Sequence, residues 1–234
     1  YRQTSNASPE SYARDPENRL LARGPRFRMR AEMLRDNALA ISGLLVEKIG
    51  GPSVKPYQPP GLWKAVTYDG DSEYVQDKGD ALYRRSLYTF WKRQSPPPNL
   101  LVFDAPTRET CTAQRSKTNT PLQALALMND PTFVESSRNL AERMMSLPNA
   151  EEPAHIELAF RSATARKPTT DEVRILLGLF DAQKAEYSKM SEAAERLLAI
   201  GDSKRNESLD SATLAAWTTV ASTILTLDET ITKR

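Results

Sequence analysis

Cysteine and histidine are almost absent from this chain of 234 residues. Cys111 and His155 are the single members of their types, so the chain contains no internal disulfide and no site built from several thiolates or imidazoles. The same scarcity excludes a His-Glu-x-x-His zinc helix and the Cys-x-x-Cys-His attachment of a c-type haem. We therefore expect this segment to carry no cofactor, no haem and no tightly held transition metal.

Glycine, net charge and long apolar runs are also scarce. Nine glycines stand against 16 prolines, which favours stiff loops. No stretch approaches the roughly 18 apolar residues that span a bilayer, so we expect no membrane insertion. The net charge of +2, from 32 Lys and Arg against 30 Asp and Glu, gives no general attraction for nucleic acid.

Apolar residues recur at alternating spacings of three and four, the pattern of amphipathic helices. Further helix starts are marked by a capping side chain, either before a proline, as in Thr120-Pro121 and Asp130-Pro131, or in the capping box of Thr169 and Glu172. A short helical turn is expected near 16–22. The predicted helices span about 28–49, with Gly50-Gly51 as the stop, 83–93, 121–128, 131–146, 151–164, 170–189 and 214–227.

These elements predict a mostly α fold, an irregular helical domain with long ordered Pro-rich loops and at most a minor β element. Residues 50–80 and 201–207 are the expected loops. A soft boundary divides a loop-rich helical part, 1–148, from a C-terminal helical part, 149–234, and we expect the two to form one continuous domain.

Most candidate catalytic or metal-ligating residues have a simpler structural interpretation. Cys111 lacks a linked base, and His155 lacks a positioned partner, so an inert thiol and a surface or capping histidine are the expected roles. The carboxylates of 69–80 could hold calcium, but their spacing does not match an EF-hand. Asp104 and Glu109 could form a glycosidase-type pair, although capping and ion pairing are commoner uses. No catalysed reaction is specified.

One stretch of the chain is crowded with cations and aromatic rings. Its candidate ligand-binding or ion-pairing residues are Arg84, Arg85, Trp91, Arg93, Asp104, Arg108 and Arg115. The positive charges require anions, which could be internal, such as Asp104, Glu109 and Asp130, or external, such as an acidic glycan or a partner protein. We expect the partners to be internal and substitution of Arg85 or Arg108 to destabilise the fold.

Three long motifs carry a family resemblance. They are GGPSVKPYQPPGLW (50–63), YRRSLYTFWKR (83–93) and FDAPTRETCTAQRSKTNTPLQALALMND (103–130), and the lead-in through DPENRLLARGPRFRMRAEMLRD fits with them. Together they resemble the planctomycete-specific domain family of unknown function that accompanies the planctomycete cytochrome c module. The resemblance covers nearly all of the chain and weakens after about Ala150.

The resemblance implies the C-terminal part of a larger exported protein, located outside the cytoplasm in the periplasm or cell envelope. Any haem would belong to an upstream domain, and those upstream domains would be partners within the same polypeptide. We expect a non-catalytic scaffold or interaction domain. A polysaccharide-associated domain, either glycan-binding or part of a hydrolytic site, is the main alternative, and an enzyme that uses Asp and Glu oxygens is a third.

Overall fold

The computed structural model describes residues 3–66 and 73–233 of the chain. Within these residues the protein is mostly helical, as the sequence predicts, and its sheet has two short strands. The elements are α1 (Pro9–Arg14), β1 (Phe27–Arg28), α2 (Ala31–Ser42), α3 (Leu62–Val66), the 3-10 turns η1 (Gly79–Tyr83) and η2 (Ser86–Tyr88), α4 (Pro98–Leu101), α5 (Pro121–Asn129), α6 (Pro131–Met145), α7 (Glu152–Thr164), α8 (Thr170–Lys189), α9 (Ser191–Leu198), α10 (Ser211–Thr226), α11 (Asp228–Ile231) and β2 (Thr232–Lys233).

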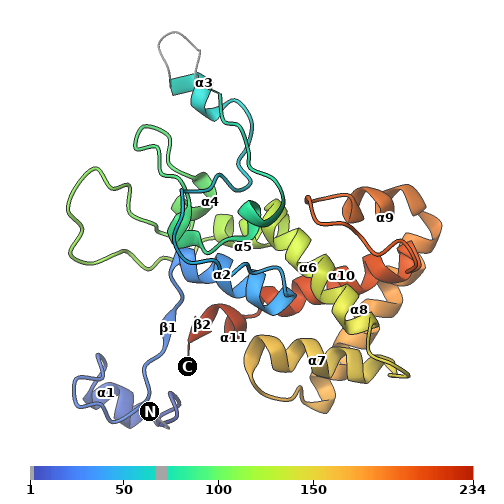
Figure 1. The fold of residues 1–234 in the computed structure, drawn as a ribbon. Coiled ribbons are helices and arrows are strands. Elements are labelled where there is room, and N and C mark those ends of the chain that lie inside the picture. Colours follow the sequence, from blue (N-terminus) through green and yellow to red (C-terminus); the bar gives the residue numbers. More distant parts are fainter. Residues whose placement is uncertain (1–2, 67–72, 234) are drawn as a thin grey trace.

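Helices α6 to α10 enclose the largest hydrophobic core (Figure 1). The central helix α10 is apolar on nearly every side and packs on α6, α8 and α9. Its Trp217 stacks on Phe180 of α8 with ring centroids 4.1 Å apart. Burial of such large side chains contributes about 1.5–3 kcal/mol each, so this core is the main source of stability for the fold.

A second core joins the N-terminal half to the C-terminus. Phe27 pairs with Lys233 and Arg28 with Thr232 in antiparallel register, which brings β1 beside the last residues of the chain. Helix α2 then packs on α6, and its Leu34 shares this core with Phe103 and residues of α5. The long loop that connects α4 to α5 (Figure 1) therefore begins within this second core, where Phe103 and Ala105 are buried.

Helices with capping chemistry begin where the sequence predicts. The side chains of Thr120 and Asp130 accept hydrogen bonds from the first turns of α5 and α6, and Thr169 and Glu172 form a reciprocal capping box at α8. The predicted helices from 121 onward are confirmed to within a few residues. Each cap satisfies backbone N–H groups that have no partner inside the helix.

The predicted helix over 28–49 is too long at both ends. Helix α2 begins at Ala31, because the residues before it pair with β2, and it ends at Ser42. Gly43 adopts φ 85°, the left-handed conformation that commonly closes a helix. Gly43, rather than Gly50-Gly51, is therefore the stop signal.

The predicted helix over 83–93 is wrong. The segment is extended between short 3-10 turns, and Val54 both donates to the carbonyl of Tyr88 and accepts from the N–H of Phe90. The buried guanidinium of Arg35 donates to the carbonyl of Arg84, within this segment, and to that of Leu82, just before it. These distant partners occupy the backbone groups that a helix would pair internally.

Several smaller features also differ from expectation. The first helix is α1 rather than a turn at 16–22, because Ser8 caps a helix that begins at Pro9. Helix α9 was not predicted, and the expected loop over 50–80 contains α3. Asp69 and Asp71, two of the carboxylates of 69–80 that were weighed as calcium ligands, lie outside the described residues. Among the helices that the structure describes, none is long and apolar enough to cross a membrane.

Candidate functional site

A pocket of about 280 Å³ lies between the start of α2, the beginning of α5 and the loop before α5. Its apolar floor belongs to the second core, and its walls carry cations, hydroxyls and amides. The residues that line it are Arg28, Met29, Arg30, Leu34, Phe103, Asp104, Thr112, Ala113, Gln114, Arg115, Ser116, Lys117 and Gln123. Most of the wall comes from the third motif, and Arg28 and Arg30 come from the lead-in.

Asp104 and Gln123 close the loop that forms the wall. The carboxylate of Asp104 accepts from the N–H of Thr118 at 2.7 Å and from its hydroxyl at 2.9 Å. The amide nitrogen of Gln123 donates to that hydroxyl at 2.8 Å and to the carbonyl of Val102 at 2.9 Å. Asp104 has φ 62°, a conformation that aspartate tolerates better than most residues. The two ends of the loop are thereby held together at the N-terminus of α5.

Positive charge exceeds negative charge around the pocket. Arg115 donates to both carboxylate oxygens of Glu32 at 2.8 and 3.0 Å. Burial alone would raise the pKa of Glu32, but the hydrogen bond from Arg115 and the nearby charge of Arg108 outweigh burial and lower the pKa. Glu32 therefore stays ionised and neutralises Arg115. Among the described residues, Arg30 and Lys117 form no ion pair, and Lys117 lies 5.8 Å from the centre of the Phe27 ring.

Two buried polar atoms in the pocket lining lack hydrogen-bond partners among the described residues. One is Nε of Arg28, whose terminal nitrogen donates to Asn119 at 2.6 Å. The other is the amide oxygen of Gln123, a side chain with 1% exposure. An unsatisfied buried polar group costs about 1–3 kcal/mol, so a water molecule or a ligand group that reached either atom would be stabilised there.

The structure distributes the predicted site residues over four places. Arg115 and Asp104 lie at the pocket. The indole N–H of Trp91 donates to the carbonyl of Thr107 at 3.0 Å, and Arg108 lies over the Trp91 ring at 4.4 Å. Arg93 is 4.0 Å from Glu109 at the surface. Trp91 is half-buried against the second core, whereas Arg93 and Arg108 are exposed.

Arg84 and Arg85 point to different environments. Arg84 is buried, lies over the Tyr88 ring at 3.9 Å, and donates to the carbonyls of Lys48, Gly50 and Pro52 at 2.5–3.0 Å. Arg85 has 58% side-chain exposure and lies 3.6 Å from Asp36. Asp130, an expected partner of the cluster, instead caps α6 through the N–H of Thr132. The buried arginine is thus paired mainly with backbone carbonyls.

Arg28, Arg30, Lys117 and Gln123 were not selected from the sequence. The alternation of arginine in RFRMR, residues 26–30, could have found two of them, because period-two spacing places alternate side chains on one face of an extended strand. Gln123 had no such signal. It lies inside a helix that is apolar on most sides, and its role depends on the loop that folds over it.

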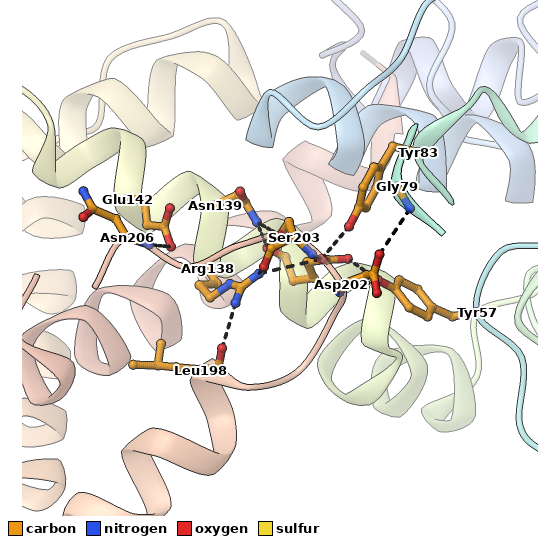
Figure 2. Close-up of polar contacts among 11 residues, drawn as sticks. Tyr57, Gly79, Tyr83, Arg138, Asn139, Glu142, Leu198, Asp202, Ser203 and Asn206 are labelled. Carbon is orange, nitrogen blue, oxygen red and sulfur yellow. Dashed lines mark hydrogen bonds and ion pairs between the residues drawn. The ribbon is translucent and has the colours of Figure 1, made fainter. Parts of the chain in front are cut away.

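A second polar cluster is centred on a buried carboxylate and links segments that are distant in sequence (Figure 2). Glu135 of α6 accepts from the hydroxyls of Tyr57 at 2.9 Å and Tyr83 at 2.8 Å and from the N–H of Ser203 at 2.7 Å. Arg138 lies 3.7 Å from this carboxylate and donates to the carbonyl of Ser203 at 2.7 Å. Glu135 has 0% exposure, so the cluster acts as an internal brace rather than an open site.

Cys111 and His155 belong to neither cluster. Cys111 is exposed and free, and His155 of α7 packs edge-on against Trp217 at 5.3 Å. Partial burial lowers the pKa of His155. In the described part of the chain, no three His, Cys, Asp or Glu side chains lie close enough together to hold a metal ion.

The sequence matches the profile of one protein family. Residues 1–180 fit the family described as PSD1, protein of unknown function (DUF1553). The matched region contains β1, α2, the loop before α5 and therefore the whole pocket lining. No curated protein and no solved structure matches the chain.

Proposed function

The chain belongs to the PSD1 family, whose description assigns no function, and from that premise we propose that it is a non-catalytic interaction domain that binds an acidic group in the pocket. The excess of positive charge in the pocket lining carries this proposal. Arg30 and Lys117 are exposed cations with no ion pair among the described residues, and the lining carboxylate, Asp104, already accepts bonds from Thr118. An anion that enters would therefore meet donors and little repulsion.

The start of α2 adds to the attraction for anions. Its cap residue, Arg30, makes no side-chain capping bond, and the first backbone N–H groups of a helix carry partial positive charge. Arg28 and Arg30 flank this helix start on the pocket side. Binding rather than catalysis is supported because no nucleophile and base are paired in the pocket lining.

The finer placement of the domain rests on the motif resemblance. We propose that the chain is the C-terminal part of a larger exported, planctomycete-type protein in the periplasm or cell envelope, with a cytochrome c-type haem, where present, in an upstream domain. The acidic group would then come from an upstream domain, a partner protein or an acidic glycan. The full-length reading frame tests this placement, since a signal peptide followed by a haem motif supports it and a cytoplasmic frame without either contradicts it.

A titration with sodium sulfate at constant ionic strength tests the pocket directly. We expect saturable shifts of the backbone amide resonances of 31–33 and 112–117. Arg30→Ala and Lys117→Ala should each weaken binding about tenfold, since each removes a charge-assisted contact, with unchanged melting temperatures. Lys189→Ala, on α8, is the matched control and should leave the affinity unchanged. Unsaturable shifts spread over all lysines, or unaltered affinity in both pocket variants, would contradict the proposal.

A further inference from the structure

We infer that the ligand of this pocket is an acidic sugar, a pyranose ring that bears a carboxylate or sulfate, rather than a bare anion. The inference rests on the proposed anion binding and extends it to the neutral part of the ligand. Its evidence is the pair of unsatisfied atoms in the lining, Nε of Arg28 and the amide oxygen of Gln123. The first is a donor and the second is an acceptor.

The orientation of the Gln123 amide is fixed by its neighbours. Its nitrogen donates to the carbonyl of Val102 and to the hydroxyl of Thr118, and a carbonyl can only accept. The amide oxygen is therefore the group left without a partner, and it requires a donor from the ligand. Carboxylates and sulfates have no donor at neutral pH, so an anion alone leaves this oxygen unsatisfied.

A hydroxyl group next to the anion satisfies both atoms. A hydroxyl donates one hydrogen bond and accepts others, so the hydroxyls of a sugar offer a donor to Gln123 and an acceptor to Arg28. Thr112, Gln114 and Ser116 add hydroxyl and amide groups to the same wall. This mixture of neutral hydrogen-bonding groups with cations matches a ligand with several hydroxyls and one negative charge.

The floor and the volume of the pocket fit one ring. Met29, Leu34 and Phe103 form an apolar floor, which can contact the C–H face of a pyranose. The volume of about 280 Å³ lies just below the range of roughly 300–1,000 Å³ that drug-sized ligands occupy. An acidic peptide would bring a carboxylate to the cations and backbone N–H donors to Gln123, but an Asp or Glu side chain has no ring for the apolar floor.

The affinities of the wild-type chain for ligands of similar size show whether it recognises the sugar hydroxyls or only the negative charge. Methyl β-D-glucuronide and glucose 6-sulfate should each bind about tenfold more tightly than cyclohexanecarboxylate, which keeps a ring and a carboxylate but has no hydroxyls. Methyl β-D-glucoside, without the charge, should bind more weakly than either acidic sugar. Isothermal titration and amide shifts of 112–117 report the affinities.

Arg28→Lys keeps the positive charge and removes Nε. This variant should reduce the preference for glucuronide over cyclohexanecarboxylate several-fold. The Ser116→Ala variant serves as a second probe of the hydroxyl-binding wall and should also weaken the glucuronide selectively.

The outcomes distinguish the two proposals. Equal affinity for glucuronide, glucose 6-sulfate and cyclohexanecarboxylate would overturn the acidic-sugar inference and leave the anion pocket intact. Tighter binding of an acetyl-Asp-Glu-amide peptide than of either sugar would overturn it in favour of an acidic protein partner. If sulfate also fails to bind, the proposed function fails with it.

Discussion

The Cα of Gly201 faces the carboxylate of Glu135 so closely that a β-carbon on Gly201 would lie 2.5 Å from Oε1 of Glu135. Gly201 also has φ 99°, a conformation that residues with a β-carbon rarely adopt. The missing side chain lets the loop after α9 approach α6, where Glu135 accepts from Ser203. The brace of Figure 2 thus depends on a glycine as well as on its charged residues.

Gly201→Ala should lower the free energy of unfolding by about 2–4 kcal/mol. About 1–2 kcal/mol would come from the left-handed backbone, and the remainder from displacement of the buried Glu135 side chain. Gly61→Ala is the control, because Gly61 has φ 80° but no atom within 4 Å of an added β-carbon. Urea denaturation of both variants measures the difference. Equal losses would show that the close approach to Glu135 carries no cost.

Tyr83→Phe should destabilise the chain by about 1–3 kcal/mol at pH 8, because Glu135 loses a buried hydrogen-bond donor. Burial and the bond to Glu135 raise the pKa of Tyr83 to about 12 from its usual 10. The Tyr83 hydroxyl therefore stays protonated to a higher pH in the folded state than in the unfolded state. Its contribution to the free energy of unfolding is complete below pH 10 and is lost as the pH rises through about 12.

The difference in free energy of unfolding between wild type and Tyr83→Phe, called the gap below, should accordingly narrow between pH 10 and 12. Urea denaturation at pH 8, 10 and 12 measures the gap. Tyr187→Phe, on α8 and outside the brace, should show no such narrowing. A gap that stays constant over this range would contradict the raised pKa of Tyr83.

The sequence predicted the fold best where the evidence was local. Thr120, Asp130 and Thr169 each mark a helix start through a side chain that bonds to its own first turn, and α5, α6 and α8 begin there. Such signals need no knowledge of distant residues. The mostly α character followed from these helices and from α7 and α10.

The segment 83–93 failed because its partners are distant in sequence. Its ring spacing fits a helix, yet Val54 and Arg35 bond to its backbone and hold it extended. Leu87, which a helix would place on the same face as Tyr83 and Trp91, is 71% exposed. Tertiary contacts here override a local periodicity.

The pocket was only partly predictable for the same reason. Asp104 and Arg115 were selected because they lie in the crowded motif, whereas Arg28 reaches the pocket through the pairing of β1 with the C-terminal strand. No spacing rule connects residue 28 to residues 112–117. Gln123 depends likewise on a loop closure that Asp104 and Thr118 complete.

Arg84→Ala should cost about 3 kcal/mol or more, and Arg85→Ala at most about 1 kcal/mol. Removal of Arg84, which has 4% exposure, leaves the three carbonyl groups of its loop without their shared donor. Arg85 forms an exposed ion pair with Asp36, and such pairs contribute little. From the sequence we expected the structural role for Arg85. The sequence alone does not show which of two adjacent arginines is buried, because the carbonyls that bind Arg84 belong to a distant loop. Thermal unfolding of both variants tests whether Arg84 is the structural arginine. Equal melting temperatures of the two variants would contradict this assignment.

Glu172→Gln should lower stability at pH 7 by about 1 kcal/mol, a modest value because the pair with Arg166 is partly exposed. Hydrogen bonds from Arg166, followed by those of the α8 capping box, lower the pKa of Glu172 to about 2 from 4.5. The folded state therefore binds the proton less readily than the unfolded state. This stabilisation is present above about pH 4.5 and is lost as the pH falls towards 2.

We expect the free energies of unfolding of wild type and Glu172→Gln, measured at pH 7, 4.5, 3 and 2, to become equal as the pH falls from 4.5 to 2. Asp171→Asn supplies the matched control, since Asp171 is the preceding acidic residue of the same helix turn, has 83% side-chain exposure and pairs with Arg174 across the surface. Its variant should stay within about 0.5 kcal/mol of wild type at every pH. If Asp171→Asn reproduces the convergence, the effect belongs to the general charge of the α8 start and not to the bonds that Glu172 makes with Arg166 and Thr169.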